Sequence, residues 1–128
     1  MATSPSAART PANPLLHILK ETLTASVRSD QPDFSARQLT VFLKVYLEPG
    51  TEHTVRGLAA ALNVSKPAIT RALDRLTDSD FIRREKDAND RRSVIVSRTS
   101  AGSTYLRTLS GYVNGADKLA AKQTAKAA

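Results

Sequence analysis

The sequence predicts a mainly α-helical fold that carries one small β-hairpin. Apolar residues recur with helical spacing in several segments, and between residues 58 and 75 two such segments meet at a tight turn. Shortly afterwards, two strand-like runs, 81–85 and 92–98, are joined by a charged loop. This order of elements is the layout of a winged helix-turn-helix domain, here flanked by N- and C-terminal helices.

Length and composition exclude several other classes of protein. A chain of 128 residues is long enough for one domain with its own core, and the absence of cysteine excludes disulfides and thiolate metal sites. No apolar run approaches the roughly 20 residues that span a bilayer, and no secretory signal is present, so we expect a soluble, cytoplasmic protein. The formal net charge of +7 favours a polyanionic partner, although composition alone does not choose between nucleic acid and an anionic membrane.

Composition also divides the chain into a domain and two tails. Residues 1–13 are rich in Ala, Ser, Thr and Pro, which predicts a disordered N-terminal tail. We expect residues 14–115 to form a single domain, with its terminal helices as the candidate dimer interface. Residues 116–128 are then an Ala/Lys-rich tail that can be disordered.

Capping and breaking signals place the first two helices. Pro14 suits the first turn of a helix that the Ser-Asp-Gln-Pro segment 29–32 breaks. A second helix opens at Ser35, which can form a capping box with Gln38, and it ends at Pro49-Gly50.

The same reasoning places the third and the last helix. Thr54 is a candidate N-cap for the third. The last helix starts at Thr99 or Ser100, and two glycines, Gly111 and Gly115, weaken it.

The turn between the third and fourth helices has the residues that a helix-turn-helix requires. Ala59 is small enough for two helices to cross closely, and Asn63 tolerates the positive φ that the turn needs. Ser65 can cap the next helix, with Pro67 in its first turn, where a missing N–H costs little. The buried stripe of this fourth helix is expected at Ile69, Ala72, Leu73 and Leu76.

The opposite face of the fourth helix is basic, and we interpret it as the surface that binds DNA. Its candidate contact residues are Ser65, Lys66, Pro67, Thr70, Arg71 and Arg75. Ser65, Lys66 and Thr70 lie near the helix N-terminus and can touch phosphate or base edges. Arg71 and Arg75 can read guanine or clamp the backbone, and Asp74 is expected to orient one of these two arginines.

The hairpin loop offers a second basic surface. Lys86, Arg91 and Arg92 are candidate DNA contacts, because arginine inserted into a narrow minor groove is a recurring mode of shape readout. Asp90 is a poor DNA contact by itself, and we expect it to brace a wing arginine.

This arrangement resembles the MarR family of bacterial transcription regulators. The matching segments are the helix-turn-helix at 58–76, the strand at 81–85 and the wing at 87–102. The family's Asp-x-Arg wing signature falls on Asp90 and Arg92, and Gly102 stands where the family has a glycine after the second wing strand. The resemblance covers roughly residues 35–110 of the printed sequence.

The resemblance implies a homodimer on an inverted-repeat DNA operator, usually a repressor and often one that responds to a small ligand. Two departures stand out. The terminal helices that build the family's dimer interface are short in this chain. Asp80 stands where the family often has glycine, so it is expected to adopt a positive φ.

The sequence therefore predicts a sequence-specific regulator that binds double-stranded DNA. An architectural or recombination-type DNA-binding protein and a protein-interaction winged helix remain alternatives. No catalytic or metal site is predicted: no nucleophile–base motif is present, and the two histidines, His17 on a helix and His53 in a polar loop, read as surface residues. No cofactor is predicted either.

Overall fold

The computed structural model describes residues 13–127, with side chains up to Gln123. The elements are α2 (Pro14–Arg28), α3 (Ala36–Leu47), β1 (His53–Thr54), α4 (Val55–Leu62), α5 (Lys66–Asp78), β2 (Ile82–Lys86), β3 (Val94–Arg98) and α6 (Ser100–Ala127). Apart from Asn13, the N-terminal tail expected at 1–13 lies outside the described residues. The predicted fold class is confirmed, and none of the described helices is long and apolar enough to cross a membrane.

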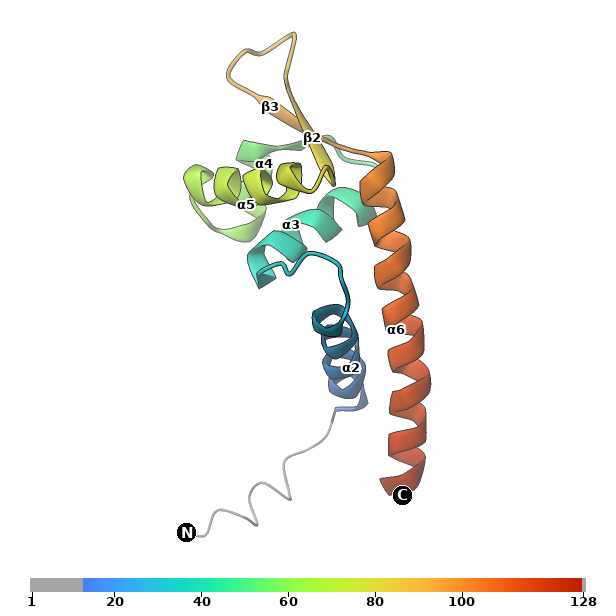
Figure 1. The fold of residues 1–128 in the computed structure, drawn as a ribbon. Helices are drawn as coiled ribbons and strands as arrows, with labels where there is room; N and C mark the ends of the chain where they lie inside the picture. The colour runs from blue at the N-terminus through green and yellow to red at the C-terminus, as the bar shows by residue number, and fades with distance from the viewer. Residues whose placement is uncertain (1–12, 128) are drawn as a thin grey trace. The chain divides into compact units, whose positions relative to one another are not determined.

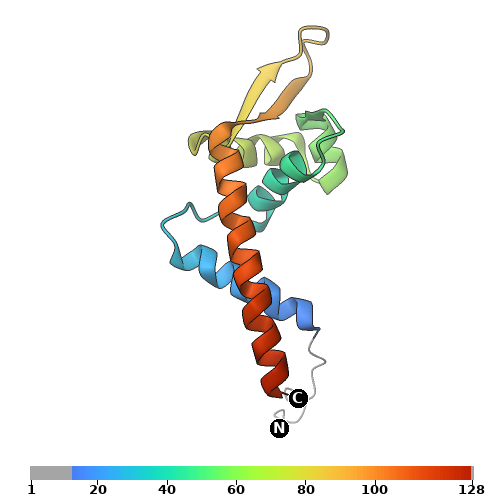
Figure 2. The same cartoon turned by 90° about the vertical axis from the view of Figure 1, so that its right-hand side faces the viewer.

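The chain forms two compact units. One contains residues 32–108, and the other combines the described residues up to 31 with those from 109 onwards. In the first unit α3, α4 and α5 pack together and the β2–β3 hairpin projects from them (Figure 1). In the second unit α2 crosses the C-terminal half of α6 (Figure 2), and the Gln123 amide donates a 3.4 Å hydrogen bond to Glu21.

The predicted caps are confirmed, because each depends on residues close together in the sequence. Ser35 and Gln38 form the reciprocal capping box of α3, and Asn13, for which no capping role was predicted, caps α2. Thr54 caps α4 by accepting from the Gly57 N–H, and Asn63 takes the left-handed conformation, φ 55°, that the turn requires.

The hairpin belongs to a three-stranded antiparallel sheet in the order β1-β3-β2. The hairpin register places Arg84 opposite Val96, and β1 pairs His53 with the same Val96 on the other side. The interpretation of His53 as a loop residue was wrong. The two residues of β1 are too few to leave a strand pattern in the sequence.

Helix α6 is longer than the sequence suggested. It runs without a break through Gly111 and Gly115 and through the segment expected to be a tail, as far as Ala127. Ala116 and Ala120 are buried.

The Tyr46 side chain links α3 to both ends of the wing by hydrogen bonds. Its hydroxyl donates to the Phe81 carbonyl at 2.6 Å and accepts the Thr99 N–H at 3.0 Å. The Tyr46 ring stacks on Phe42, and the Phe81 ring stacks on Tyr105. The turn before β2 has the predicted positive φ, 60° at Asp80, and the Asp80 carbonyl accepts the Thr99 hydroxyl at 2.6 Å.

Gly102 lies in the first turn of α6, where a side chain would collide with this hydrogen-bonded junction. A Cβ there would lie much closer to the Tyr46 hydroxyl and the Phe81 carbonyl than van der Waals contact allows. The glycine is required by close approach, because the residue has no positive φ.

We predict that Gly102→Ala lowers the free energy of unfolding by about 2–3 kcal/mol, because the added methyl forces the junction apart. Urea denaturation measures this. The matched control is Gly111→Ala, also in α6, where a Cβ would meet nothing within 4 Å. The control should stabilise the protein by up to about 1 kcal/mol through helix propensity. Equal stability of Gly102→Ala and the wild type would contradict the packing argument.

Candidate nucleic-acid interface

The N-terminal half of α5 presents a polar and basic surface. Ile69, Ala72, Leu73 and Leu76 are buried, as predicted, and Ala68 is buried with them. Ser65 caps the helix by accepting from the Ala68 N–H at 3.2 Å. The exposed residues of this half that the sequence singled out are Ser65, Lys66, Pro67, Thr70 and Arg71.

Arg75, the predicted contact residue farthest along α5, makes contacts within the protein. The Arg75 guanidinium lies 5.2 Å from the centre of the Phe34 ring and donates to the Ser79 hydroxyl at 3.3 Å. Arg75 is half-buried and does not belong to the exposed surface at the N-terminal half of α5.

The prediction that Asp74 orients Arg71 or Arg75 was wrong. Its carboxylate accepts from the Arg84 guanidinium at 2.7 Å, and it pairs with neither Arg71 nor Arg75. The reason is that β2 packs against α5, which brings Arg84 to Asp74. This ion pair joins residues ten positions apart in different elements, so no helical spacing could have indicated it.

The wing loop is ordered by a main-chain hydrogen bond and by the carboxylates of Asp87 and Asp90. The Asp87 N–H donates to the Ser93 carbonyl at 3.0 Å and closes the loop. Asp90 accepts from the Arg92 N–H at 3.0 Å, so it holds the main chain of Arg92 instead of its guanidinium. The predicted contact residues of the wing, Lys86, Arg91 and Arg92, are all exposed.

Two shallow hollows border α5 and add two residues that the sequence reasoning missed. The first is lined by Val55, Arg56, Lys66, Thr70, Arg92, Ser93 and Val94. The second is lined by Ser35, Arg37, Gln38, Ala68, Arg71 and Ala72. Arg56 and Arg37 come from the first turns of α4 and α3. Their helices were predicted, but only tertiary packing brings them beside α5.

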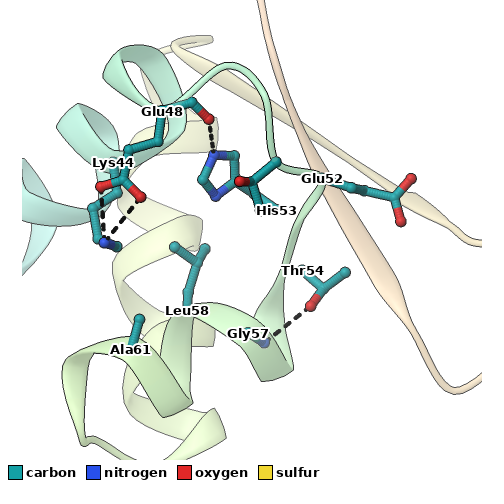
Figure 3. Close-up of a pocket in the computed structure, with 9 residues that line it drawn as sticks. Lys44, Glu48, Glu52, His53, Thr54, Gly57, Leu58 and Ala61 are labelled. Carbon is teal, nitrogen blue, oxygen red and sulfur yellow. Dashed lines mark hydrogen bonds and ion pairs between the residues drawn. The ribbon is translucent and has the colours of Figure 1, made fainter.

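A third hollow, between α3, β1 and α4, has a different character (Figure 3). Its lysine, Lys44, is paired with Glu48 at 2.9 Å, and the His53 ring is hydrogen-bonded to the Glu48 carbonyl at 2.9 Å. Glu52 adds a further carboxylate to the lining. The lysine of this hollow is paired with a carboxylate of the same hollow, and none of the predicted site residues lines it.

Among the described residues, the exposed basic residues of α5 and of the wing loop lack such partners. Within residues 13–123, ion pairs join Lys20 to Glu21, Lys44 to Glu48 and Arg84 to Asp74. None of them involves the exposed cations of α5 or of the wing loop. In this part of the chain, no three His, Asp or Glu side chains converge in a way that could hold a metal ion.

Comparison with known proteins agrees with this geometry. The family model described as MarR matches residues 34–94, which span the helix-turn-helix and most of the hairpin. No curated protein sequence matches the chain.

Three solved structures illustrate the similarity. A mutant of MarR from E. coli, complexed with operator DNA, is 26% identical with a TM-score of 0.61, and the match covers 83% of this chain and 71% of that one. YusO from Bacillus subtilis is 23% identical with a TM-score of 0.61 and coverages of 86% and 72%. A MepR mutant from S. aureus is 17% identical with a TM-score of 0.71 and coverages of 96% and 85%, a likeness of fold alone. The chain belongs to the MarR family of winged-helix transcription regulators.

Proposed function

We propose that this chain is a sequence-specific transcription regulator that binds double-stranded DNA as a homodimer. Helix α5 enters the major groove, and Arg91 and Arg92 of the wing reach the flanking minor groove. It acts as a repressor by occupying its operator. The observation that carries the proposal is the exposed surface of α5, where Lys66, Thr70 and Arg71 lie without a carboxylate partner among the described residues.

Comparison with related proteins supports the choice of partner. The similar MarR mutant from E. coli was crystallised with operator DNA, and AbfR, 20% identical to this chain, was crystallised bound to DNA. This chain is a basic winged-helix member of the MarR family, so we expect its exposed basic surface to bind the same kind of ligand, double-stranded DNA.

The homodimer is supported by an apolar stripe on α2. Leu15, Leu19, Leu23 and Val27 follow one another at four-residue spacing, so they share one face of the helix, and all four are exposed. No residue of α2 is buried. A row of large apolar side chains in water is unfavourable, and a second copy of the same surface would cover it.

We predict that Arg71→Ala relaxes the preference for particular bases, with a loss of about 1–3 kcal/mol in discrimination at those positions. Selection from a random DNA pool, followed by titration of single-base variants, measures this. Arg75→Ala should leave base preference unchanged and lower stability, because the Arg75 guanidinium lies over Phe34. Uniform weakening on all sequences by Arg71→Ala would count against a base-reading role.

We predict that Arg91→Ala with Arg92→Ala weakens binding to all DNA sequences and flattens the dependence of log affinity on log salt. Affinity titrations across salt concentrations measure both effects. The matched control is Lys118→Ala with Lys122→Ala, which removes the same charge from exposed positions of α6. An unchanged slope in the wing variant, or an equal change in the control, would rule out the wing assignment.

We predict that Leu19→Glu shifts the protein from dimer to monomer in sedimentation and weakens operator binding with it. Leu19 is 53% exposed in the apolar stripe of α2. The matched control, Leu47→Glu, changes a leucine that is 61% exposed on α3, outside the proposed interface, and should remain dimeric. A Leu19→Glu variant that still sediments as the wild type would refute this interface.

A further inference from the structure

The two hollows beside α5 share one property, because each gathers cations and neither is lined by a carboxylate. Arg56, Lys66 and Arg92 surround the first, and Arg37 and Arg71 border the second. Within the described residues, none of these five side chains makes an ion pair or a side-chain hydrogen bond. Like charges held close together repel, so an anion in each hollow would relieve an unfavourable arrangement.

The hollows lie on opposite flanks of α5. Lys66 and Thr70, four residues apart, lie on the flank that borders the first hollow. Ala68, Arg71 and Ala72 border the second and, at about 100° per residue, lie on the other side of the helix. The exposed face that carries Pro67 lies between them. A ligand that receives this face would therefore meet both hollows at once.

The position of the first hollow matches a feature of duplex DNA. Its walls are α4, α5 and the loop end of the wing, with Arg56, Lys66 and Arg92 contributed one by each. A strand of the sugar-phosphate backbone separates every major groove from the adjacent minor groove. With α5 in the first groove and the wing in the second, this strand has to pass between them, where the hollow lies.

We propose that each hollow binds a phosphate of the DNA backbone. Arg56 and Arg37 then bind the two strands that border the major groove occupied by α5. This inference rests on the proposed function. The guanidinium group suits the role, because its planar fork of N–H donors matches the oxygens of phosphate. Such contacts fix the register of the protein on the duplex and carry no sequence information themselves.

The test measures binding of Arg37→Ala and Arg56→Ala to two duplexes across salt concentrations. One duplex is an operator selected from a random pool with the wild-type protein, and the other is unrelated. Each variant should lose roughly three- to ten-fold in affinity on both duplexes. Each should reduce the slope of log affinity against log salt by about 0.9, the value for one phosphate contact.

Three further variants separate phosphate binding from other causes. Arg56→Lys keeps the charge and should retain the salt slope, as Lys also binds phosphate. Lys118→Ala, at an exposed position of α6, should leave both affinity and slope unchanged. The double variant Arg37→Ala with Arg56→Ala should lose the product of the two single losses, since the two phosphates are separate.

A second measurement changes the DNA and leaves the protein intact. Uncharged methylphosphonate placed at single positions of the operator should weaken the wild type at two positions that border the major groove of each half-site. Arg56→Ala should be insensitive at one of them and Arg37→Ala at the other. Insensitivity of both variants at the same position would refute the assignment of the two arginines to different strands.

The outcomes distinguish this inference from the proposed function. If the wild type fails to bind duplex DNA at low salt, the proposed function fails. If the wild type binds but the two variants keep its salt slope, or lose affinity for the operator alone, the phosphate assignment is overturned and DNA binding stands.

Discussion

The geometry of the binding surface depends on the hydroxyl group of Tyr46. This buried oxygen donates to the carbonyl of Phe81, just before β2, and accepts the N–H of Thr99, just after β3. Without Tyr46 the buried carbonyl of Phe81 would lose this partner, at a cost of about 1–3 kcal/mol, and the partly buried N–H of Thr99 would lose its partner as well. One side chain of α3 therefore holds the two ends of the hairpin together and fixes them to the helical core, and Gly102 is needed because the junction has no room for a Cβ.

Fixing the base of a hairpin also fixes the direction of its tip. The antiparallel register between β2 and β3 transmits the position of Phe81 and Thr99 to the loop that carries Arg91 and Arg92. The Arg84–Asp74 ion pair adds a second connection, between β2 and α5. At an exposed site such a pair contributes little to stability, so its effect is better understood as orientation. The wing and α5 are thereby held in one arrangement before any ligand is present, which lowers the entropy lost on binding.

The sequence predicted features that depend on residues near one another in the chain. The caps at Ser35, Thr54 and Ser65, the left-handed Asn63 and the buried stripe of α5 are set by local hydrogen bonds and by helical spacing, and all were predicted. Features that depend on tertiary packing were missed. The partner of Asp74, the short strand β1 and the closeness of Arg56 to Arg92 follow from how the hairpin folds back on the helices, and no spacing along the sequence encodes that. Local patterns in the sequence could therefore indicate candidate residues on α5 and the wing, but not the arginines of α3 and α4 that only tertiary packing brings beside them.

The charge order along α5 is the strongest sign that its sequence was selected for more than stability. The helix begins with Lys66 and has no acidic residue in its first turn, and its last turn ends with Asp78, although it also contains one basic residue, Arg75. The helix dipole favours the reverse order, acidic residues first and basic residues last, by about 0.3–1 kcal/mol for each charge. Helix stability alone thus does not account for Lys66 and Asp78. A phosphate backbone at the N-terminal half does, because it is attracted by Lys66, Arg71 and the free N–H groups and repelled by the carboxylate of Asp78. In the proposed complex the same order decides which end of α5 enters the groove, so the cost in helix stability and the orientation on DNA would have one cause.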